Sequence, residues 1–397
     1  MITVEQATQI ILSNYLSFGK ETVPMQLATG RILHENLIAD RDFPPFDRVS
    51  MDGIAFDFTF FEKGKRAFKI EGLQAAGAPQ MALRDPGNCL EVMTGTILPE
   101  GVDTVVRYED LVMNDGVATI QTEHVVSKQN IHHQGIDRGV GSVIVERGGV
   151  LSPAEIGVAA TVGKTHLLVG KMPNVAIIST GDELVNVDEK PLPYQIRKSN
   201  VHNLAAAIRQ WGIQPNLFHL PDEKEAIRGI LTTVLEQHDA LILSGGVSAG
   251  KLDFVPTVLE ELNVEKLFHK VAQRPGKPFW FGRSERSVVF AFPGNPVSSF
   301  MCLHRYFRPW LRGSMGLAPF EEKFAVLGKD FYFRPDLTYF LQVKITFGKN
   351  GQLTGTPIEG KGSGDLANLV DADAFMELPR ERAKFSKGDV FPIMPYR

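Results

Sequence analysis

The sequence predicts an α/β protein with additional β domains, and the main evidence is three apolar runs that are each followed by a glycine-rich loop. The runs with their loops cover residues 177–183, 241–250 and 289–296. Each run is short, rich in β-forming residues and bounded by turn residues, which is typical of a strand buried in a parallel sheet. Segments of helical period lie between them, at 200–211 and 222–237. Strands that alternate with helices predict a parallel or mixed sheet with right-handed crossovers.

The position of these loops predicts one ligand-binding crevice. Parallel strands all end on the same edge of a sheet, so the three loops are expected to meet there, where open α/β sheets bind ligands. The loops offer backbone N–H groups, hydroxyls and carboxylates. That combination indicates a phosphate-bearing ligand and a divalent cation.

The N-terminal third of the chain predicts a β-rich lobe carried on a linking segment. Thr3 and Gln6 form a capping-box pattern that opens an amphipathic first helix. The glycine-rich stretch 130–150 is expected to return from the lobe to the N-terminal region, and Ser152, Pro153 and Glu155 predict the start of a further helix. Turn signals separate the strands expected in the lobe, which are 67–70, 89–93, 104–108 and 117–121.

The C-terminal section, 320–397, alternates apolar and polar residues and predicts a separate small β domain. We therefore divide the chain into a linking domain (1–43 with 130–173), the β-rich lobe (44–129), the α/β domain (174–316) and the C-terminal β domain (317–397).

The composition excludes several classes of protein. The 397 residues have a net charge of −4, so no general nucleic-acid-binding surface is expected. Cys89 and Cys302 match no metal-ligand spacing and are expected to be reduced thiols of a cytosolic protein. The N-terminus lacks the features of a signal peptide, and no segment reaches the roughly 18 apolar residues of a membrane span. We expect a cytoplasmic protein with no nucleic-acid or membrane partner.

The loop 244–250 and the acidic residues around it carry the cation hypothesis. Its glycines let a ligand approach the backbone closely, although a tight strand-to-helix turn would need them too. Glu183 and Asp253 each follow one of the loops, and two carboxylates at one sheet edge suit Mg²⁺. Asp253 could instead cap a helix over 254–262, and the two roles can coexist. For Asp222, which has Glu225 three residues later, capping is the favoured interpretation.

The segment 269–278 holds three cationic side chains, those of Lys270, Arg274 and Lys277. On an extended strand Lys270 and Arg274 would point to the same face. Such a group would hold a phosphate or another oxyanion, whereas a solvated charge run is the ordinary alternative. His132 and His133 are adjacent rather than at ligand spacing, so metal binding there is not expected.

Taken together, these segments resemble the molybdopterin molybdenumtransferase family, of the MoeA and gephyrin E-domain type. The matching motifs occur in family order over nearly the whole chain. They are Pro44–Asp47 with Met51–Gly53, Met93–Thr96, Thr180–Leu184, Ser199–Asn200, Ser244–Gly250 with Asp253, Arg274–Pro278 and Pro293–Pro296. The α/β domain alone resembles the broader molybdopterin-binding fold, which adenylyltransferases and CinA-like proteins share.

The resemblance implies a homodimeric enzyme that takes adenylylated molybdopterin and molybdate, hydrolyses the adenylate with a divalent cation such as Mg²⁺, and places molybdenum on the dithiolene. It implies that Glu183, Asp222 and Asp253 serve the cation and the adenylate, with Glu183 and Asp253 as metal ligands. Asp52 and Thr94 would reach the site from the lobe, and Asp52, Glu183 and Asp253 would be catalytic. The substrate-binding residues implied are Thr94, Asp222, Ser244, Gly245, Gly246, Ser248, Lys270, Arg274, Lys277, Pro293 and Asn295.

The chain departs from the family pattern at three places. Arg48-Val49-Ser50 stands where the family usually has Asn-Ser or a similar pair, and Lys198 precedes Ser199 where Asp or Asn is common. The second cation of 269–278 is Arg274 rather than Lys, which keeps the charge but favours bidentate oxyanion contact. Two other functions compete with the enzyme: a non-catalytic pterin-binding or receptor-clustering scaffold, and a molybdopterin adenylyltransferase. The retained acids and Lys277 argue against the first, and the additional domains argue against the second.

Overall fold

The structure, a computed structural model, describes residues 1–246, 254–358, 360 and 362–397. The chain divides into two compact units. We call residues 1–21, 30–32 and 169–397 the α/β unit, and residues 22–29 and 33–168 the lobe unit. Among the described residues, no helix has the length and apolar character needed to cross a membrane.

A six-stranded sheet forms the centre of the α/β unit, in the order β16-β13-β17-β21-β20-β18. The first four strands are parallel, and β20 and β18 are antiparallel to their neighbours. The predicted parallel or mixed sheet is therefore confirmed. The strands are β13 (Val175–Thr180), β16 (Asn216–Leu220), β17 (Ala240–Ser244), β18 (Glu265–His269), β20 (Trp280–Arg283) and β21 (Val288–Phe292).

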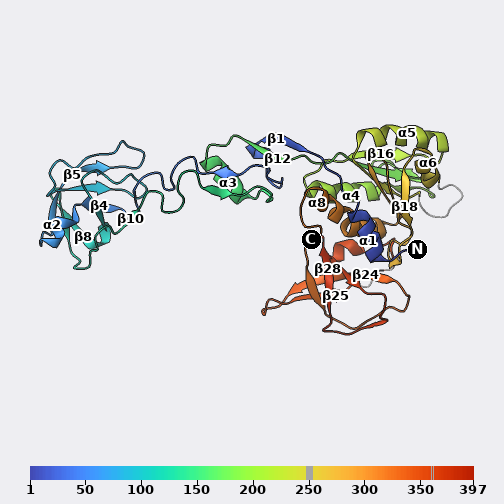
Figure 1. The fold of residues 1–397 in the computed structure, drawn as a ribbon. Coiled ribbons are helices and arrows are strands. Elements are labelled where there is room, and N and C mark those ends of the chain that lie inside the picture. The colour runs from blue at the N-terminus through green and yellow to red at the C-terminus, as the bar shows by residue number, and fades with distance from the viewer. Residues whose placement is uncertain (247–253, 359, 361) are drawn as a thin grey trace. The chain divides into compact units, whose positions relative to one another are not determined.

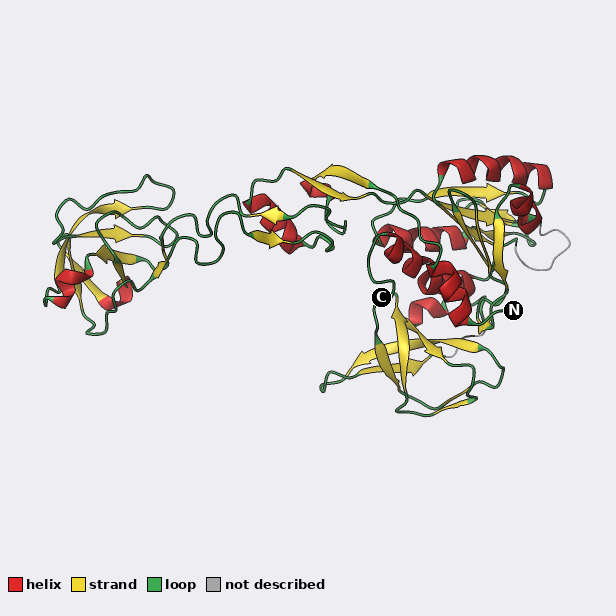
Figure 2. Cartoon of the chain, in the orientation of Figure 1, coloured by secondary structure: helices red, strands yellow, loops and turns green. Residues whose placement is uncertain are grey.

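Helices cover both faces of this sheet (Figures 1 and 2). Alternate strand residues face opposite layers, so Ile177 packs in one core and Ile178 in the other. Burial on both faces explains why the strands appear in the sequence as continuous apolar runs. One layer holds α5 (Lys224–Gln237) and α6 (Val255–Glu261); the other holds α1 (Val4–Leu12), α4 (Ser199–Gln210), α7 (Pro296–Cys302), the π-helical turn η3 (Leu303–Phe307) and α8 (Arg308–Ser314).

The C-terminal domain is a small closed barrel. Its strands follow the order β24-β25-β22-β28-β26, and β26 pairs back to β24. A short strand of the α/β domain, β19 (Gln273–Arg274), adds to β24 in parallel and so joins the two domains. The strands are β22 (Phe324–Leu327), β24 (Thr338–Phe347), β25 (Leu353–Pro357), β26 (Ala374–Leu378) and β28 (Val390–Pro395); β23 (Phe331–Tyr332), β27 (Lys384–Phe385) and α9 (Asn368–Asp371) lie in its connections.

A buried ion pair also fixes the barrel to the helical layer. The Arg305 guanidinium of η3 contacts both carboxylate oxygens of Glu377 on β26, with Nε 2.9 Å from Oε2. The same guanidinium donates to the Thr8 hydroxyl of α1 at 3.1 Å. The Arg305 side chain thus links η3, β26 and α1, which are distant in sequence.

The lobe is built on a further six-stranded sheet, in the order β7-β4-β6-β5-β9-β8. The four strands predicted from the sequence are confirmed as β5, β6, β7 and β9, and the sequence analysis missed β4 and β8. The strands are β4 (Gly53–Phe56), β5 (Ala67–Gln74), β6 (Cys89–Val92), β7 (Thr104–Arg107), β8 (Leu111–Asn114) and β9 (Val117–Ile120), with α2 (Phe58–Glu62) between β4 and β5 and η2 (Tyr108–Asp110) after β7.

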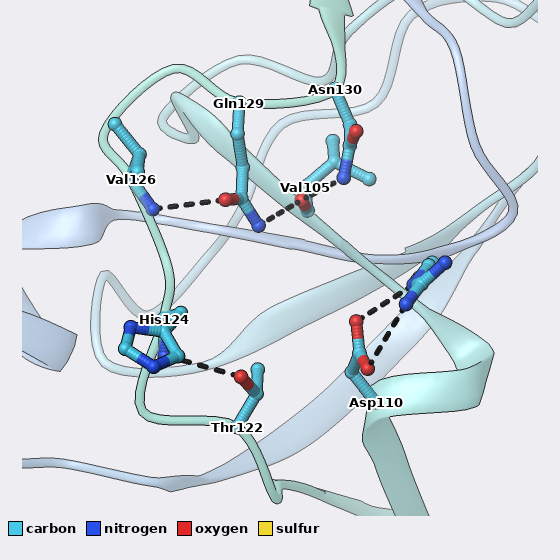
Figure 3. Close-up of polar contacts among 8 residues, drawn as sticks. Val105, Asp110, Thr122, His124, Val126, Gln129 and Asn130 are labelled. Atoms are coloured by element: carbon cyan, nitrogen blue, oxygen red, sulfur yellow. Dashed lines mark hydrogen bonds and ion pairs between the residues drawn. The ribbon is translucent and has the colours of Figure 1, made fainter.

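The chain leaving the lobe is tied to its edge strand β7 by side-chain amides (Figure 3). The amide groups of Gln129 and Asn130 both donate to the Val105 carbonyl, at 3.2 and 3.0 Å, while Gln129 accepts from the Val126 N–H. These bonds satisfy part of an exposed strand edge, as native sheets require. They also fix where the returning chain starts.

The stretch 130–150 returns to the N-terminal region, as predicted, and it also pairs with the outgoing chain. β10 (Ile131–His132) pairs with β3 (Arg48–Val49), and β11 (Val143–Val145) pairs with β2 (Leu37–Ile38). Both predicted capping boxes are confirmed, those of Thr3 with Gln6 and of Ser152 with Glu155. The remaining elements are β1 (Lys20–Pro24), η1 (Met25–Leu27), α3 (Pro153–Thr161), β12 (His166–Gly170), β14 (Leu184–Val185) and β15 (Ile196–Arg197).

Candidate functional site

The loops after β13, β17 and β21 line one hollow of about 380 Å³, which we call the crevice. The prediction that the three loops meet at one sheet edge is therefore confirmed. The start of α4 forms a further wall. Polar and glycine residues of the lining include Thr180, Gly181, Glu183, Ser199, Asn200, Asp222, Ser244, Gly245, Gly246, Gly294 and Asn295.

Two adjacent glycines are required by the close packing of the first two loops. Gly245 and Gly246 both have positive φ, +102° and +71°. A Cβ on Gly245 would lie 2.7 Å from the Thr180 hydroxyl oxygen, and one on Gly246 would lie 2.9 Å from a Val255 methyl. Side chains there would therefore displace neighbouring groups as well as strain the backbone. The glycines leave backbone, rather than side chains, facing a ligand.

Asn200 holds the second and third loops together. Its Nδ2 donates to the Ser244 hydroxyl at 2.9 Å and to the Gly294 carbonyl at 2.6 Å. A third bond between these loops runs from the Gly245 N–H to the Phe292 carbonyl at 3.1 Å. Asn200 lies at the start of α4, whose N-cap residue, Lys198, makes no side-chain capping bond. Helix N–H groups without such a partner favour an anionic ligand at this wall.

The interpretation of Asp222 as a helix cap is wrong. Helix α5 has Glu223 at its N-cap, with no side-chain capping bond. The Asp222 carboxylate instead accepts from the Asp182 N–H at 3.3 Å, and Asp182 accepts from the Asp222 N–H at 3.1 Å. This reciprocal pair joins the loops after β13 and β16, and its sequence separation of 40 residues hid it from a local capping pattern.

A histidine beside this pair was not found from the sequence. His219, on β16, contacts the Ser179 hydroxyl at 3.0 Å through Nδ1. Burial lowers the pKa of His219, and the nearby Lys198 ammonium lowers it further. The imidazole is therefore neutral at physiological pH and adds no positive charge beside the two aspartates.

The predicted metal ligands are only partly described. Glu183 lines the crevice, whereas Ser248 and Asp253 lie outside the described residues. Within the described part of the chain, no cluster of three or more His, Cys, Asp or Glu side chains is placed to hold a metal. Glu183 and Asp222 are thus the described carboxylates that face the crevice.

A second cavity, of about 460 Å³, lies between the α/β domain and the barrel. Arg274 and Lys277 supply its cations, and its polar lining includes Gln273, Asn295, Gln342 and Ser363. Gln273 is fully buried, accepts from the Tyr306 hydroxyl and donates to the Gly276 carbonyl at 3.0 Å. These bonds hold the turn that carries both cations.

The prediction that Lys270 and Arg274 share one face of a strand is wrong. Strand β18 ends at His269, and Lys270 has a φ of +73°, which breaks the extended backbone. Its N–H donates to the Phe279 carbonyl. The described residues that line the second cavity include Arg274 and Lys277, but Lys270 is not one of them.

The loop Pro293–Pro296 forms the wall between the crevice and the second cavity. Asn295 lines both hollows, and Pro293 lines the second. The Nδ2 of Asn295 donates to the Ser363 hydroxyl at 2.8 Å, which ties this loop to the barrel. Nothing in the sequence distinguishes Ser363, Gln342 or Gln273 as site residues, because a polar residue in a turn or alternating strand carries no distinct signal.

Asp52 and Thr94 lie together in the lobe unit, while the other described site residues belong to the α/β unit. The Asp52 carboxylate accepts from the Thr94 N–H at 2.5 Å. This backbone bond, followed by one to the Thr94 hydroxyl, lowers the pKa of Asp52. The carboxylate is exposed and ionised at neutral pH.

Comparisons with known proteins identify the family. Family profiles match the chain in three consecutive parts: the MoeA N-terminal region (domains I and II) at residues 2–163, a probable molybdopterin binding domain at 176–313, and the MoeA C-terminal region (domain IV) at 325–396. A molybdopterin molybdenumtransferase of Synechocystis sp. is 41% identical over 397 residues, which is 99% of each chain. The chain belongs to the MoeA family.

Other MoeA relatives agree with this assignment over the full length. A molybdopterin molybdenumtransferase of Staphylococcus epidermidis is 28% identical and covers 99% of this chain and 95% of its own. The crystal structure of a molybdopterin biosynthesis MoeA protein from Pyrococcus horikoshii superposes with a TM-score of 0.82, at 28% identity, over 100% of this chain and 99% of that one. The fold class and the resemblance inferred from the motifs are both confirmed.

Proposed function

We propose that this chain inserts molybdenum into molybdopterin, using adenylylated molybdopterin and molybdate as substrates and releasing AMP. The observation that carries the proposal is the pair of adjoining hollows separated by Asn295. One has features that suit a phosphate-bearing nucleotide, and the other has two cations that suit a small oxyanion. Membership of a family whose named relatives are molybdenumtransferases supports it.

In this proposal the crevice holds the adenylate and the pterin phosphate. Ser244, Gly245 and Gly246, with Ser248 as a further proposed contact later in the sequence, cradle phosphate through backbone N–H groups and hydroxyls. Water attacks the adenylate phosphorus, the bond to the pterin phosphate oxygen breaks, and AMP leaves. Asp52, Glu183 and Asp253 are the proposed catalytic carboxylates.

The described residues fit a bound Mg²⁺. Mg²⁺ in phosphate-binding sites takes one or two protein carboxylates and completes its shell with substrate phosphates and water. Glu183 and Asp222 already supply that number at the crevice, and Asp253 is the further proposed ligand. When bound, the cation would neutralise charge on the phosphates.

The second cavity is the proposed molybdate site. Arg274 presents a guanidinium suited to bidentate oxyanion contact, and Lys277 adds a compact charge on the same turn. Pro293 and Asn295 form its boundary with the crevice. Lys270 remains a proposed contributor through the resemblance alone, since it does not line this cavity.

We further propose a cytoplasmic homodimer whose sites are shared between subunits. Asp52 and Thr94 would then act on the crevice of the partner. The exposure of three apolar residues in the lobe unit supports a second copy as the partner: Ile38 and its cross-strand partner Val143 are 48% and 43% exposed, and Val140 is 63% exposed. Exposed apolar residues that gather in this way often mark an interface.

The direct test supplies purified protein with adenylylated molybdopterin, Mg²⁺ and molybdate and follows AMP release and molybdenum bound to the pterin. Release of AMP together with molybdenum insertion supports the proposal. Pterin binding without turnover would favour the non-catalytic scaffold. Formation of adenylylated molybdopterin from ATP would favour the adenylyltransferase.

The cavity geometry predicts which cation substitutions weaken the use of molybdate. We expect Arg274→Ala and Lys277→Ala each to raise the apparent KM for molybdate by about 10-fold to 100-fold, because a hydrogen bond to a charged group contributes about 1.5–3 kcal/mol. Affinity for AMP should change much less. Lys266→Ala, which removes an exposed ammonium on β18 that pairs with Glu260, is the matched control and should change the molybdate KM by less than about two-fold. A Lys266 effect as large as the other two would contradict this assignment.

The Thr94 contacts predict the acid limb of the pH profile. Ionised Asp52 is favoured by the Thr94 N–H and hydroxyl, which lower its pKa. Thr94→Val removes only the hydroxyl, so the Asp52 pKa should rise and activity should be lost at a higher pH than in the wild type. A pH series of kcat/KM measures this, with Thr119→Val in the same lobe sheet as the control. An acid limb that does not move would exclude Asp52 as the group that titrates.

Because the pKa is lowered, any stability from ionised Asp52 is present at neutral pH and lost only as pH falls through the lowered value.

A further inference from the structure

The loop Pro293–Pro296 lies between the two hollows and is held by hydrogen bonds on both sides. On the crevice side, Asn200 donates to Ser244 and to Gly294, the residue before Asn295. On the other side, Asn295 donates to the Ser363 hydroxyl, and the Ser363 carbonyl accepts from the Val297 N–H at 3.1 Å. The loop Pro293–Pro296 is therefore held from both hollows at once.

We propose that binding in the crevice and binding in the second cavity are thermodynamically coupled through the Asn295–Ser363 hydrogen bond, so that each ligand raises the affinity for the other. The proposal rests on the proposed function for the identity of the two ligands, a nucleoside monophosphate and a tetrahedral oxyanion. The coupling itself depends only on the contacts of the loop Pro293–Pro296, which separates the two hollows.

The hydrogen bonds that Ser363 can form predict a positive coupling, in which each ligand strengthens the binding of the other. Ser363 accepts at Oγ from Asn295, so its own hydroxyl proton can be donated to an oxyanion beside Arg274 and Lys277. Donation to an anion makes Oγ a better acceptor, and the bond from Asn295 becomes stronger. That bond holds the loop whose residues Gly294 and Asn295 line the crevice. The first ligand therefore strengthens a contact that already holds the loop, and the second ligand binds to a wall that has less conformational freedom left to lose.

Repulsion between the two anions acts in the opposite direction. Arg274 and Lys277 reduce this repulsion, because they lie on the cavity side of the wall. Removal of the Ser363 hydroxyl leaves this repulsion and both cations in place. The difference in coupling between the wild type and Ser363→Ala therefore isolates the contribution of the hydrogen bond.

The experiment measures AMP binding with Mg²⁺ by titration calorimetry, with and without saturating sodium molybdate, and the reciprocal titration of molybdate with and without AMP. We expect each ligand to tighten the other by at least about five-fold in the wild type, equally in both directions. In Ser363→Ala the factor should fall below about two-fold when molybdate is again saturating. Ser298→Ala, which removes a hydroxyl from the same cavity on α7, is the matched control and should keep the wild-type factor.

Every other outcome would overturn the inference and would show which part of it is wrong. Independent binding of AMP and molybdate in the wild type would reject the coupling but leave the proposed function standing. Full coupling in Ser363→Ala would reject the hydrogen bond as its route. Failure of both AMP and molybdate to bind the wild type would reject the proposed function and the coupling together. A thermal-unfolding measurement shows whether Ser363→Ala is folded, and the conservative Ser363→Thr should restore the coupling.

Discussion

A mixture of Asp52→Asn and Glu183→Gln subunits is expected to recover about a quarter of the wild-type activity, although each variant alone is inactive. Asp52 belongs to the lobe unit and Glu183 to the crevice of the α/β unit. If each site takes its lobe from one subunit and its crevice from the other, a heterodimer holds one site with both lesions and one site with neither. Random exchange makes half of the dimers mixed, with one good site of two, which gives the statistical estimate of about one quarter.

The measurement is AMP release after subunit exchange, with exchange itself shown by differently tagged subunits. Both substitutions keep the size of the side chain and remove its charge, so loss of activity in the separate variants would not come from a packing defect. Mixing two preparations of the same variant is the control and should stay inactive. If the mixed dimers form but remain inactive, each site is built within one chain and the shared-site proposal fails.

Gly53→Ala is expected to destabilise the lobe by about 3 kcal/mol or more and to lower activity by at least about 100-fold. A Cβ at this position would lie 1.9 Å from the Val106 carbonyl oxygen of the neighbouring strand β7. Both are backbone-fixed, so β4 and β7 must move apart, and overpacking of this kind is destabilising. Asp52, a proposed catalytic residue, immediately precedes Gly53, and a displacement of about 1 Å of a catalytic group can cost about 100-fold in rate.

Denaturant unfolding and steady-state turnover measure the two effects. Gly139→Ala in the same unit is the matched control, because its added Cβ would meet no atom within 4 Å. It should leave both quantities close to the wild-type values. A Gly53→Ala protein with normal stability and normal turnover would show that the sheet accommodates the methyl group and that the glycine of this motif has another purpose.

How much of the structure the sequence predicts depends on how local the signal is. The three strand-loop units, helices α4 and α5 and four lobe strands follow from periodicity and turn residues within short windows. Strand β4 was missed because Gly53–Phe56 is wholly buried and shows no alternation, and β8 because Leu111–Asn114 is an intermediate-to-exposed strand at the edge of the sheet.

The candidate site shows the same difference between features with a local sequence signal and features that depend on long-range contacts. The crevice was predictable because parallel strands must end together, whatever their side chains. The prediction that Asp222 caps a helix was wrong because its carboxylate accepts a hydrogen bond from Asp182, 40 residues away in the sequence. The prediction that Lys270 shares a strand face with Arg274 was wrong because the positive φ of Lys270 changes the direction of the chain. Ser363 and Asn200 act through long-range hydrogen bonds, and a single sequence carries no record of those.

The pairing of β19 with β24 has a consequence for how this protein can change over time. Arg274 lies on a strand of one domain that is hydrogen-bonded to a strand of the other, and the cavity beside it takes its opposite wall from the barrel. In the proposed anion site the turn and the barrel wall must therefore change together, because a substitution in one alters the fit of the other. Exchange of the whole barrel for that of a relative should lower anion affinity unless the turn is exchanged with it, whereas nucleotide binding in the proposed crevice should change less.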